Sequence, residues 1–489
     1  MIGRAEDPVG ASSPPELVAS GAPSGGLGIA FVLAIGLAVV AIIPTAVVPL
    51  LGTLAGQLHG SASSIAWSVT AVSLAYGVTN PACGRLGDIY GYRNIILACL
   101  AITGIGTVLC AIATAMPMFL VGRILQGAAG GLIPVSIGLV RNTVSPDKVR
   151  VGMGLVNSGI GLGVGVGFML GGLLQDYAWN VTFWIMLVFV LVAIVSIAML
   201  VPRPQGRSSR SLRDFDLIGA VLITIGATGI LLPLSKGAEW GWTSPTTLGL
   251  FAAGAAVLVV FAKWESRHVA PLVQLRLFAV PHFLLPNIAV ALLAATTGAV
   301  FIFFVGYTSA PPDLAGYGFG ASVLRAGSFM LPYSIMAFLV SPLSARLGQG
   351  VGARTLLITG GMLTTLTFAF LTWNHDQQWQ IYLGSAVYGI ALACFNPALY
   401  ALVADAFSID KAGVAQGMST LSEQLGSSVG SAATTAVLAA SLIPGTQLST
   451  AGAYTHAYVL CVGFATVGLI VAVVEAFIHR TRGSAIRGR

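Results

Sequence analysis

A charged, glycine-rich hinge separates two long apolar segments of this chain and reads Gly84-Arg85-Leu86-Gly87-Asp88-Ile89-Tyr90-Gly91-Tyr92-Arg93. A related stretch occurs later and reads Ala345-Arg346-Leu347-Gly348-Gln349-Gly350-Val351-Gly352-Ala353-Arg354. The Arg-Leu-Gly, the later glycine and the closing arginine fall in the same places in both stretches. Two copies of one hinge in the same chain direction indicate a duplicated unit, that is, a parallel internal repeat.

A second pair of matching segments lies at almost the same offset. Ser145-Pro146-Asp147-Lys148 is matched by Ser408-Ile409-Asp410-Lys411. The glycines that follow also align, with Gly154, Gly163 and Gly167 matched by Gly417, Gly426 and Gly430. The duplication therefore extends well beyond the hinge.

The composition places this unit in a membrane. Hydrophobic residues make up 56% of the chain and charged residues 8%, whereas an average soluble domain has roughly 25% charged residues. Fourteen apolar segments are long enough to cross a bilayer as helices. They cover residues 27–51, 66–83, 94–115, 118–140, 151–175, 180–201, 217–235, 247–263, 283–308, 321–344, 355–372, 381–404, 413–442 and 457–478.

The basic residues predict the orientation, because cytoplasmic loops accumulate lysine and arginine. If both termini are cytoplasmic, all but three of the 23 lysines and arginines fall on cytoplasmic segments. The three exceptions are Lys236, expected outside, and Arg123 and Arg325, expected within spans. The net charge is +7, and we interpret one cytoplasmic run of basic residues as an anchor at anionic lipid headgroups, so nucleic acid is not an expected partner. This run consists of Arg203, Arg207, Arg210 and Arg213.

The predicted fold is an all-α integral membrane protein with two six-helix bundles and two inserted helices. Residues 1–26 form a disordered cytoplasmic tail, 27–201 the N-terminal bundle, 202–282 the linkers with inserted helices 7 and 8, 283–478 the C-terminal bundle, and 479–489 a basic cytoplasmic tail. We expect the inserted pair to pack on the outside of the bundles and to carry no buried charge. The five cysteines lie in or beside apolar segments and are interpreted as packing residues.

Three motifs resemble those of the major facilitator superfamily. The hinge resembles its signature gating loop at Gly84, Leu86, Asp88, Gly91 and Arg93. Arg123-Ile124-Leu125-Gln126-Gly127 resembles the fourth-helix Arg-x-x-Gln-Gly motif, and Gly163, Gly167, Gly171 and Gly172 resemble the fifth-helix antiporter motif. With fourteen helices, the chain is similar to the drug:proton antiporter branch, and the resemblance implies a link between Arg123 and proton coupling.

The chain departs from the family pattern in two informative places. The antiporter motif has Phe168 where a proline is usual. The first helix reads Ile43-Pro44-Thr45 where the branch often has Asp-x-Thr, so the customary acid is absent.

The missing acid directs attention to the remaining charges within spans, because an ionisable residue at the bilayer centre costs about 2.5 to 3.5 kcal/mol on insertion scales. Glu423 lies near the middle of segment 413–442 in the most polar stretch of any span. We interpret it as a protonatable carboxyl on the cargo path; the alternative is a structural pair with a neighbouring helix. Arg123 either pairs with Glu423 or holds a backbone carbonyl. Glu475 is expected at the membrane interface.

Two further features suggest conformational change. Asp88 can accept hydrogen bonds from the opening turn of a helix in the other bundle, and the resemblance implies that this contact is an inside latch. Its counterpart in the second hinge is Gln349. Segment 151–175 carries glycine on every face, and we interpret it as a helix that slides against the other bundle; plain packing is the alternative.

The sequence favours export of amphipathic or lipophilic compounds in exchange for protons, which is multidrug efflux by alternating access. The alternative is a transporter of one endogenous solute or lipid, by symport or exchange without classical proton antiport. An enzyme is disfavoured because every histidine lies outside the spans, in a loop, and no catalytic or metal-ligand constellation appears. We expect no cofactor, a proton gradient as the driving force, a monomer, and a plasma or bacterial inner membrane as the location.

The topology can be tested by labelling. In a cysteine-free background, Ser209→Cys and Ser244→Cys lie on either side of segment 217–235. A membrane-impermeant maleimide added to whole cells is expected to modify the cysteine at 244 and to spare the one at 209. Equal labelling of both sites from outside would contradict the predicted orientation.

Overall fold

The computed structural model describes residues 26–58, 62–145, 148–174, 177–203, 216–268, 281–406, 412–444, 446 and 448–487. The first part of the chain forms α1 (Leu27–Thr45), η1 (Val48–Leu50), α2 (Leu51–Gln57), α3 (Ala62–Tyr90), α4 (Tyr92–Ala111), α5 (Met116–Gln126), η2 (Gly127–Gly131), α6 (Leu132–Thr143), α7 (Val149–Leu173) and α8 (Trp179–Leu200). The later part forms α9 (Leu217–Trp240), α10 (Pro245–Glu265), α11 (Pro281–Ser309), α12 (Pro312–Ala315), α13 (Val323–Ser328), α14 (Leu331–Val351), α15 (Ala353–Trp373), α16 (Gln378–Ala406), α17 (Ala412–Ala439) and α18 (Ala451–Arg487).

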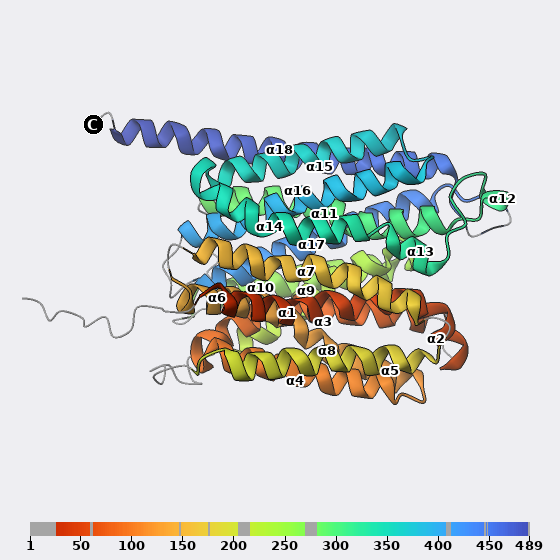
Figure 1. Ribbon diagram of the computed structural model, residues 1–489, viewed down its shortest axis with the longest axis horizontal. Coiled ribbons are helices and arrows are strands. Elements are labelled where there is room, and N and C mark those ends of the chain that lie inside the picture. The colour runs from red at the N-terminus through yellow and green to blue at the C-terminus, as the bar shows by residue number, and fades with distance from the viewer. Residues whose placement is uncertain are drawn as a thin grey trace, which may run out of the picture.

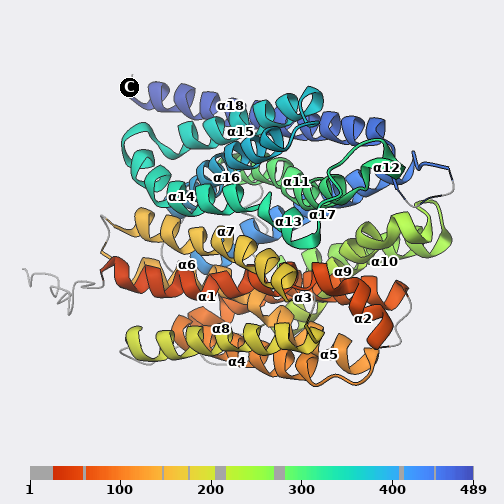
Figure 2. The ribbon, with the colours of Figure 1, turned by 45° about the vertical axis from the view of Figure 1, so that its right-hand side comes forward.

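The long helices run side by side in two halves (Figure 1). One half contains α1, α3, α4, α5 and α8, and the other contains α11, α14, α15, α16 and α18. The two halves meet where α7 packs between α1 and α14. Figure 2 brings α9 and α10 forward at the side of this junction. In both views α18 ends at the end of the bundle where α1 begins.

The all-helical membrane fold is confirmed. Among the described residues, eleven helices are long and apolar enough to cross a membrane. Each of the fourteen predicted segments contains a helix, but α3, α9 and α17 are not among the eleven, so the number fourteen stays a prediction. These three helices contact one another, which gives the polar side chains of α3 and α17 protein neighbours in place of lipid.

The first glycine face of α7 packs directly on the backbone of α1. A Cβ atom on Gly159 would lie 2.1 Å from the carbonyl oxygen of Ala34, and one on Gly163 would lie 2.3 Å from that of Ala38. Real Cβ atoms do not approach backbone oxygen so closely. The two helices therefore reach this separation because these positions lack side chains.

The second glycine face of α7 packs against the other half. A Cβ on Gly161 would lie 2.7 Å from that of Ala337 in α14, and one on Gly154 would lie 2.8 Å from the carbonyl oxygen of Ser341. The Ser341 hydroxyl donates a hydrogen bond to the Gly154 carbonyl at 2.8 Å. Glycine on several faces of α7 thus serves two different helix contacts, one within its half and one between halves.

The aligned glycines of the second half make the equivalent contact within that half. Cβ atoms on Gly426 and Gly430 of α17 would lie 1.9 and 1.8 Å from the carbonyl oxygens of Ala291 and Ala295 in α11. α11 is the first long helix of the second half, as α1 is of the first. The same spacing of glycines therefore joins corresponding helices in both halves.

The inserted pair differs from the prediction that it has no buried charge. Asp216, Lys236 and Glu265 are 4%, 2% and 3% exposed. Asp216 caps α9 by accepting from the backbone N–H of Gly219 at 2.8 Å, and Trp264 Nε1 donates to it at 2.9 Å. The prediction was wrong because the charges lie near the helix ends, where neighbouring elements cover them. α9 also contacts both halves, through α3 and α17.

The backbone contact between α7 and α1 can be tested by adding one methyl group. Gly163→Ala forces the two helices apart or strains them, and overpacking of this kind costs about 1–3 kcal/mol. We expect a clearly lower melting temperature for the purified protein in detergent. The matched control is Gly463→Ala in α18, where a Cβ would meet nothing within 4 Å. Equal melting temperatures for the two variants would contradict the close approach.

Candidate functional site

Arg123 holds three helices of the first half together. Its side chain is 0% exposed at the end of α5. Nε donates to the carbonyl oxygen of Ser68 in α3 at 3.0 Å, and Nη1 donates to that of Ile43 in α1 at 3.3 Å. Nη1 also donates to Oε1 of Gln126 at 2.6 Å. Of the two predicted roles for Arg123, the structure contains the contact with backbone carbonyls.

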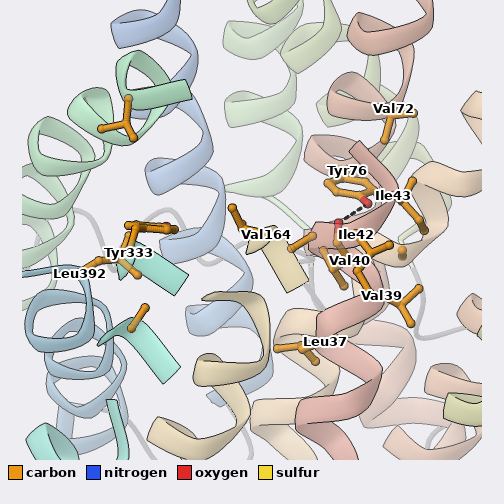
Figure 3. Packing of buried hydrophobic residues seen from close by; sticks show 14 of the residues in the cluster. Leu37, Val39, Val40, Ile42, Ile43, Val72, Tyr76, Val164, Tyr333 and Leu392 are labelled. Carbon is orange, nitrogen blue, oxygen red and sulfur yellow. Dashed lines mark hydrogen bonds between the residues drawn. The ribbon is translucent and has the colours of Figure 1, made fainter. Parts of the chain in front are cut away.

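The Ile43-Pro44-Thr45 segment leaves one further backbone carbonyl of α1 in need of a donor. Pro44 has no N–H, so the Val40 carbonyl loses its usual helical partner. Tyr76 of α3 donates its hydroxyl to that carbonyl at 2.7 Å, and Figure 3 shows the ring directed at α1. Tyr76 and Arg123 together satisfy backbone oxygens near the end of α1, in a region where water is scarce.

The polar network continues from Arg123 into α4. The Gln126 amide donates to the Thr107 hydroxyl at 3.0 Å. Within the described residues, Arg123 forms no ion pair with Glu423, and its Nη2 has no hydrogen-bond partner. The predicted alternative of an Arg123–Glu423 pair is therefore wrong for this structure. All hydrogen-bond partners of this buried cation among the described residues are neutral.

Glu423 lies in the second half, on α17, and is half-buried. The Tyr400 hydroxyl of α16 donates to Oε2 of Glu423 at 3.3 Å. Asn396, one turn before Tyr400, also lies beside this carboxyl, and the Tyr333 ring of α14 lies close enough to interact with its charge. Glu423 forms no ion pair with any residue that the structure describes.

An aromatic pair borders this carboxyl. Tyr333 stacks on Tyr388 with ring centroids 5.8 Å apart and an interplanar angle of 17°. Two hydroxyls of α11 fix Tyr388, because its OH lies 3.0 Å from Oγ1 of Thr296 and 2.7 Å from Oγ1 of Thr297. In Figure 3, Tyr333 faces the junction from the second half. Val164 of α7 lies between Tyr333 and the labelled apolar residues of α1.

Sequence reasoning identified Glu423 and missed its partners Asn396, Tyr400 and Tyr333. A signal was present for one of them, because Asn396 directly precedes Pro397 in the middle of an apolar segment. Such a polar residue beside a proline is typical of an irregular, functional position in a membrane helix. Nothing in the sequence indicates that Tyr333 and Tyr400 come from different helices to the same carboxyl.

The gating loop forms the end of α3 and the start of α4. Gly91 has φ +86°, a conformation that favours glycine. The Tyr92 hydroxyl donates to Oδ1 of Asp88 at 2.5 Å. Arg93 donates to the carbonyl oxygens of Val201 and Ala198 at the end of α8, at 2.9 and 2.7 Å. Residues 407–411, which precede α17, lie outside the described residues, so the predicted latch contact of Asp88 stays a prediction.

The second hinge uses its closing arginine differently. Arg354 Nε donates to both carboxylate oxygens of Glu475 in α18 at 3.0 Å, and His282 Nδ1 of α11 lies 3.8 Å from Oε1 of the same carboxylate. Glu475 is 1% exposed, so protein neighbours cover this carboxylate, and its expected place at the membrane interface stays a prediction. His282, His456 and His479 also lie within helices and not in loops. Tertiary contacts at the bundle end cover what appears as an interfacial charge in the sequence.

The antiporter-motif glycines divide between two contacts. Gly163 and Gly167 belong to the face on α1, and a Cβ on Gly167 would overlap the Thr45 hydroxyl at 1.9 Å. Gly172 faces the other half, because its Cβ would lie 2.8 Å from Cα of Leu324 in α13. Gly171 is buried in the same turn. The motif therefore spans both glycine faces of α7.

A comparison with family models matches residues 33–323 and 292–488 to the Major Facilitator Superfamily. The chain belongs to this superfamily. Together the two ranges cover residues 33 to 488, which is nearly all of the chain. The match confirms the family that the hinge motif indicated. Members of this family are transporters, so the interpretation as a non-enzymatic membrane transporter agrees with the family.

Several curated relatives are exporters of antibiotics or drugs. The chain is 30% identical over 393 residues to a probable actinorhodin transporter of Streptomyces coelicolor, covering 76% of this chain and 65% of that protein. It is 29% identical to a tetracenomycin C resistance and export protein of Streptomyces glaucescens, over 77% of this chain and 69% of the relative. It is 25% identical to the multidrug export protein EmrB of Escherichia coli, over 78% and 74%.

Solved structures share the fold. The human organic anion transporter MFSD10 aligns with a TM-score of 0.61 and 17% identity, over 91% of this chain and 99% of that chain. The nucleoside transporter NupG aligns with a TM-score of 0.57 and 14% identity, over the same shares. At such low sequence identities, the comparison shows a shared arrangement of helices and nothing further about function.

Arg123→Lys tests the carbonyl contacts of the first half. Lysine keeps the positive charge. Its single ammonium group lacks the planar set of N–H donors with which the guanidinium bonds to Ser68, Ile43 and Gln126 at the same time. Each buried carbonyl left without a donor costs about 1–3 kcal/mol, so we expect a lower melting temperature in detergent. Arg325→Lys is the matched control, because Arg325 is exposed and bonds to the Gln378 side chain at 3.1 Å. A stable Arg123→Lys variant would contradict the structural role.

Proposed function

We propose that the protein exports amphipathic or lipophilic compounds by proton antiport with alternating access. The antibiotic and drug exporters among its relatives support the cargo class. One observation supports coupling to protons. Glu423 is a half-buried carboxyl, and its neighbours among the described residues are neutral. Because no cation holds it ionised, the carboxyl can be neutral or charged without breaking an ion pair, as a proton-coupling group requires.

Its surroundings suit a cargo that is aromatic or lipophilic. The Tyr333–Tyr388 stack offers a rigid apolar face beside Glu423, and the buried Oδ1 of Asn396 has no hydrogen-bond partner in the described structure. An apolar surface with few convergent polar groups is typical of small-molecule sites. We propose that cargo and proton compete for this region of the second half.

The contacts between halves support alternating access. α7 meets α14 through the Gly154 and Gly161 face, which has almost no side chains to interlock. A smooth contact of this kind allows one half to rock against the other without rotamer changes. The face of Gly159 and Gly163 on α1 has backbone against backbone within one half. We propose that the Gly154 and Gly161 face slides, that the Gly159 and Gly163 face stays fixed, and that Asp88 holds the outward-facing state.

We further propose fourteen spans in two six-helix bundles with α9 and α10 inserted, and both termini in the cytoplasm of a cell membrane. The even number is supported by the common end at which α1 begins and α18 finishes. We propose that a monomer works without a bound cofactor and that the proton gradient supplies the energy.

The second candidate function is transport of one endogenous solute or lipid without classical proton antiport. It is favoured by Ile43, which stands where the branch often has an acid. It is also favoured by Arg123, which binds the Ile43 carbonyl and has no acidic partner among the described residues. In this alternative, Glu423 binds the solute directly, and a pH gradient does not drive accumulation.

Glu423→Gln separates the two candidates. Glutamine mimics the protonated carboxyl, so proteoliposomes with this variant are expected to exchange cargo down its gradient and to lose accumulation driven by a pH difference. One cationic and one neutral lipophilic dye are measured in the same vesicles. Asp313→Asn, at an exposed acid in α12, is the control and should transport normally.

The other possible results of the two-dye experiment assign different roles to Glu423. Loss of the cationic dye alone, with pH-driven transport of the neutral dye, would assign Glu423 to binding the charge of the cargo and would place proton coupling at another group. Absence of pH-driven accumulation by the unaltered protein would favour the second candidate. Full pH-driven transport of both dyes by the variant would overturn the role of this carboxyl.

A further inference from the structure

Two of the five cysteines meet beside the gating loop. Cys83 of α3 and Cys99 of α4 are 8% and 4% exposed, and their Sγ atoms lie 3.6 Å apart. Both are free thiols. Cys83 directly precedes Gly84, so the ten-residue hinge lies on the stretch of chain between the two sulfurs. Neither thiol takes part in the proposed transport chemistry.

A glycine in a third segment, the 3-10 helix η2, leaves space for the two thiols. A Cβ on Gly131, the last residue of η2, would lie 2.4 Å from Sγ of Cys83 and 3.3 Å from Sγ of Cys99. Any side chain at Gly131 would therefore displace the sulfurs. The two thiols occupy a small junction of three segments in which their nearest reactive neighbour is each other.

We propose that Cys83 and Cys99 form a redox modification site, which a hydroperoxide converts into a disulfide. One thiol sulfur attacks the peroxide, the O–O bond breaks, and a sulfenic acid and water form. The second sulfur then attacks the sulfenic sulfur, the S–O bond breaks, and the disulfide forms with release of a second water. With hydrogen peroxide as the oxidant, two thiols and one peroxide molecule thus give one disulfide and two waters; an organic hydroperoxide would release an alcohol in place of the first water.

The disulfide would restrain the hinge that lies between the two cysteines. A disulfide has an S–S distance of about 2.0 Å, so the two sulfurs must approach and draw the end of α3 toward α4. The Asp88–Tyr92 hydrogen bond already joins these helices at the same end. Oxidation therefore closes a covalent loop around the gating loop, and we infer that it slows the movement of the hinge during transport.

The site is tested first by counting thiols, a readout independent of the cargo. Purified protein in proteoliposomes is treated with hydrogen peroxide, denatured, and labelled with a maleimide polymer that shifts its mass. The chain has five cysteines, and we expect three to remain reactive after oxidation and all five after reduction. Cys83→Ser and Cys99→Ser should each keep four. The matched control, Cys110→Ser, removes a buried thiol of α4 that bonds to the Phe119 carbonyl, and should fall from four to two.

Transport is measured in the same vesicles, and this second readout rests on the proposed export function. We expect oxidation to slow dye transport about tenfold in the unaltered protein and in Cys110→Ser, with recovery on reduction, and to leave Cys83→Ser and Cys99→Ser unaffected. Five reactive thiols after oxidation would overturn the site. Three thiols with unchanged transport would overturn its effect on the hinge. Absence of dye transport in untreated vesicles that still form the disulfide would contradict the export function and leave the site standing.

Discussion

The structure depends on how closely α7 approaches two neighbours at once. Gly159 and Gly163 let it lie on the backbone of α1, while Gly154 and Gly161 let it lie on α14 of the other half. In a bilayer there is little hydrophobic force between helices, so close packing through small residues supplies much of the association. α7 therefore connects the halves and also belongs firmly to one of them, as the proposed rocking motion requires.

The two halves use this frame for different electrostatic purposes. In the first half, buried Arg123 donates to the carbonyl oxygens of Ile43 in α1 and Ser68 in α3, so it joins these two helices to α5. In the second half, Glu423 has a hydroxyl neighbour in Tyr400 and no described cation. A cation surrounded by neutral acceptors stays charged, whereas a carboxyl beside neutral donors can accept a proton. This difference is the reason why we propose the second half as the place of proton exchange.

The duplicated hinges show how repeated sequence can acquire different contacts. Arg93 and Arg354 occupy the same place in the two copies, and each ties its helix to the last helix of its half. Arg93 does so through the carbonyl oxygens that end α8, whereas Arg354 does so through the buried Glu475. The same geometric task is thus carried out by a helix terminus in one half and by an ion pair in the other.

The sequence by itself determined the membrane class, the position of nearly every helix and the family, and it singled out Arg123 and Glu423 as charges within spans, because apolar length and local motifs follow from neighbouring residues. The partners of those charges came only from the tertiary structure. Arg123 bonds to Ser68 and Ile43, and Glu423 meets Tyr400, because helices distant in the chain pack side by side. Sequence periodicity describes one helix at a time, and which atoms of another helix face a buried charge is decided when the helices pack.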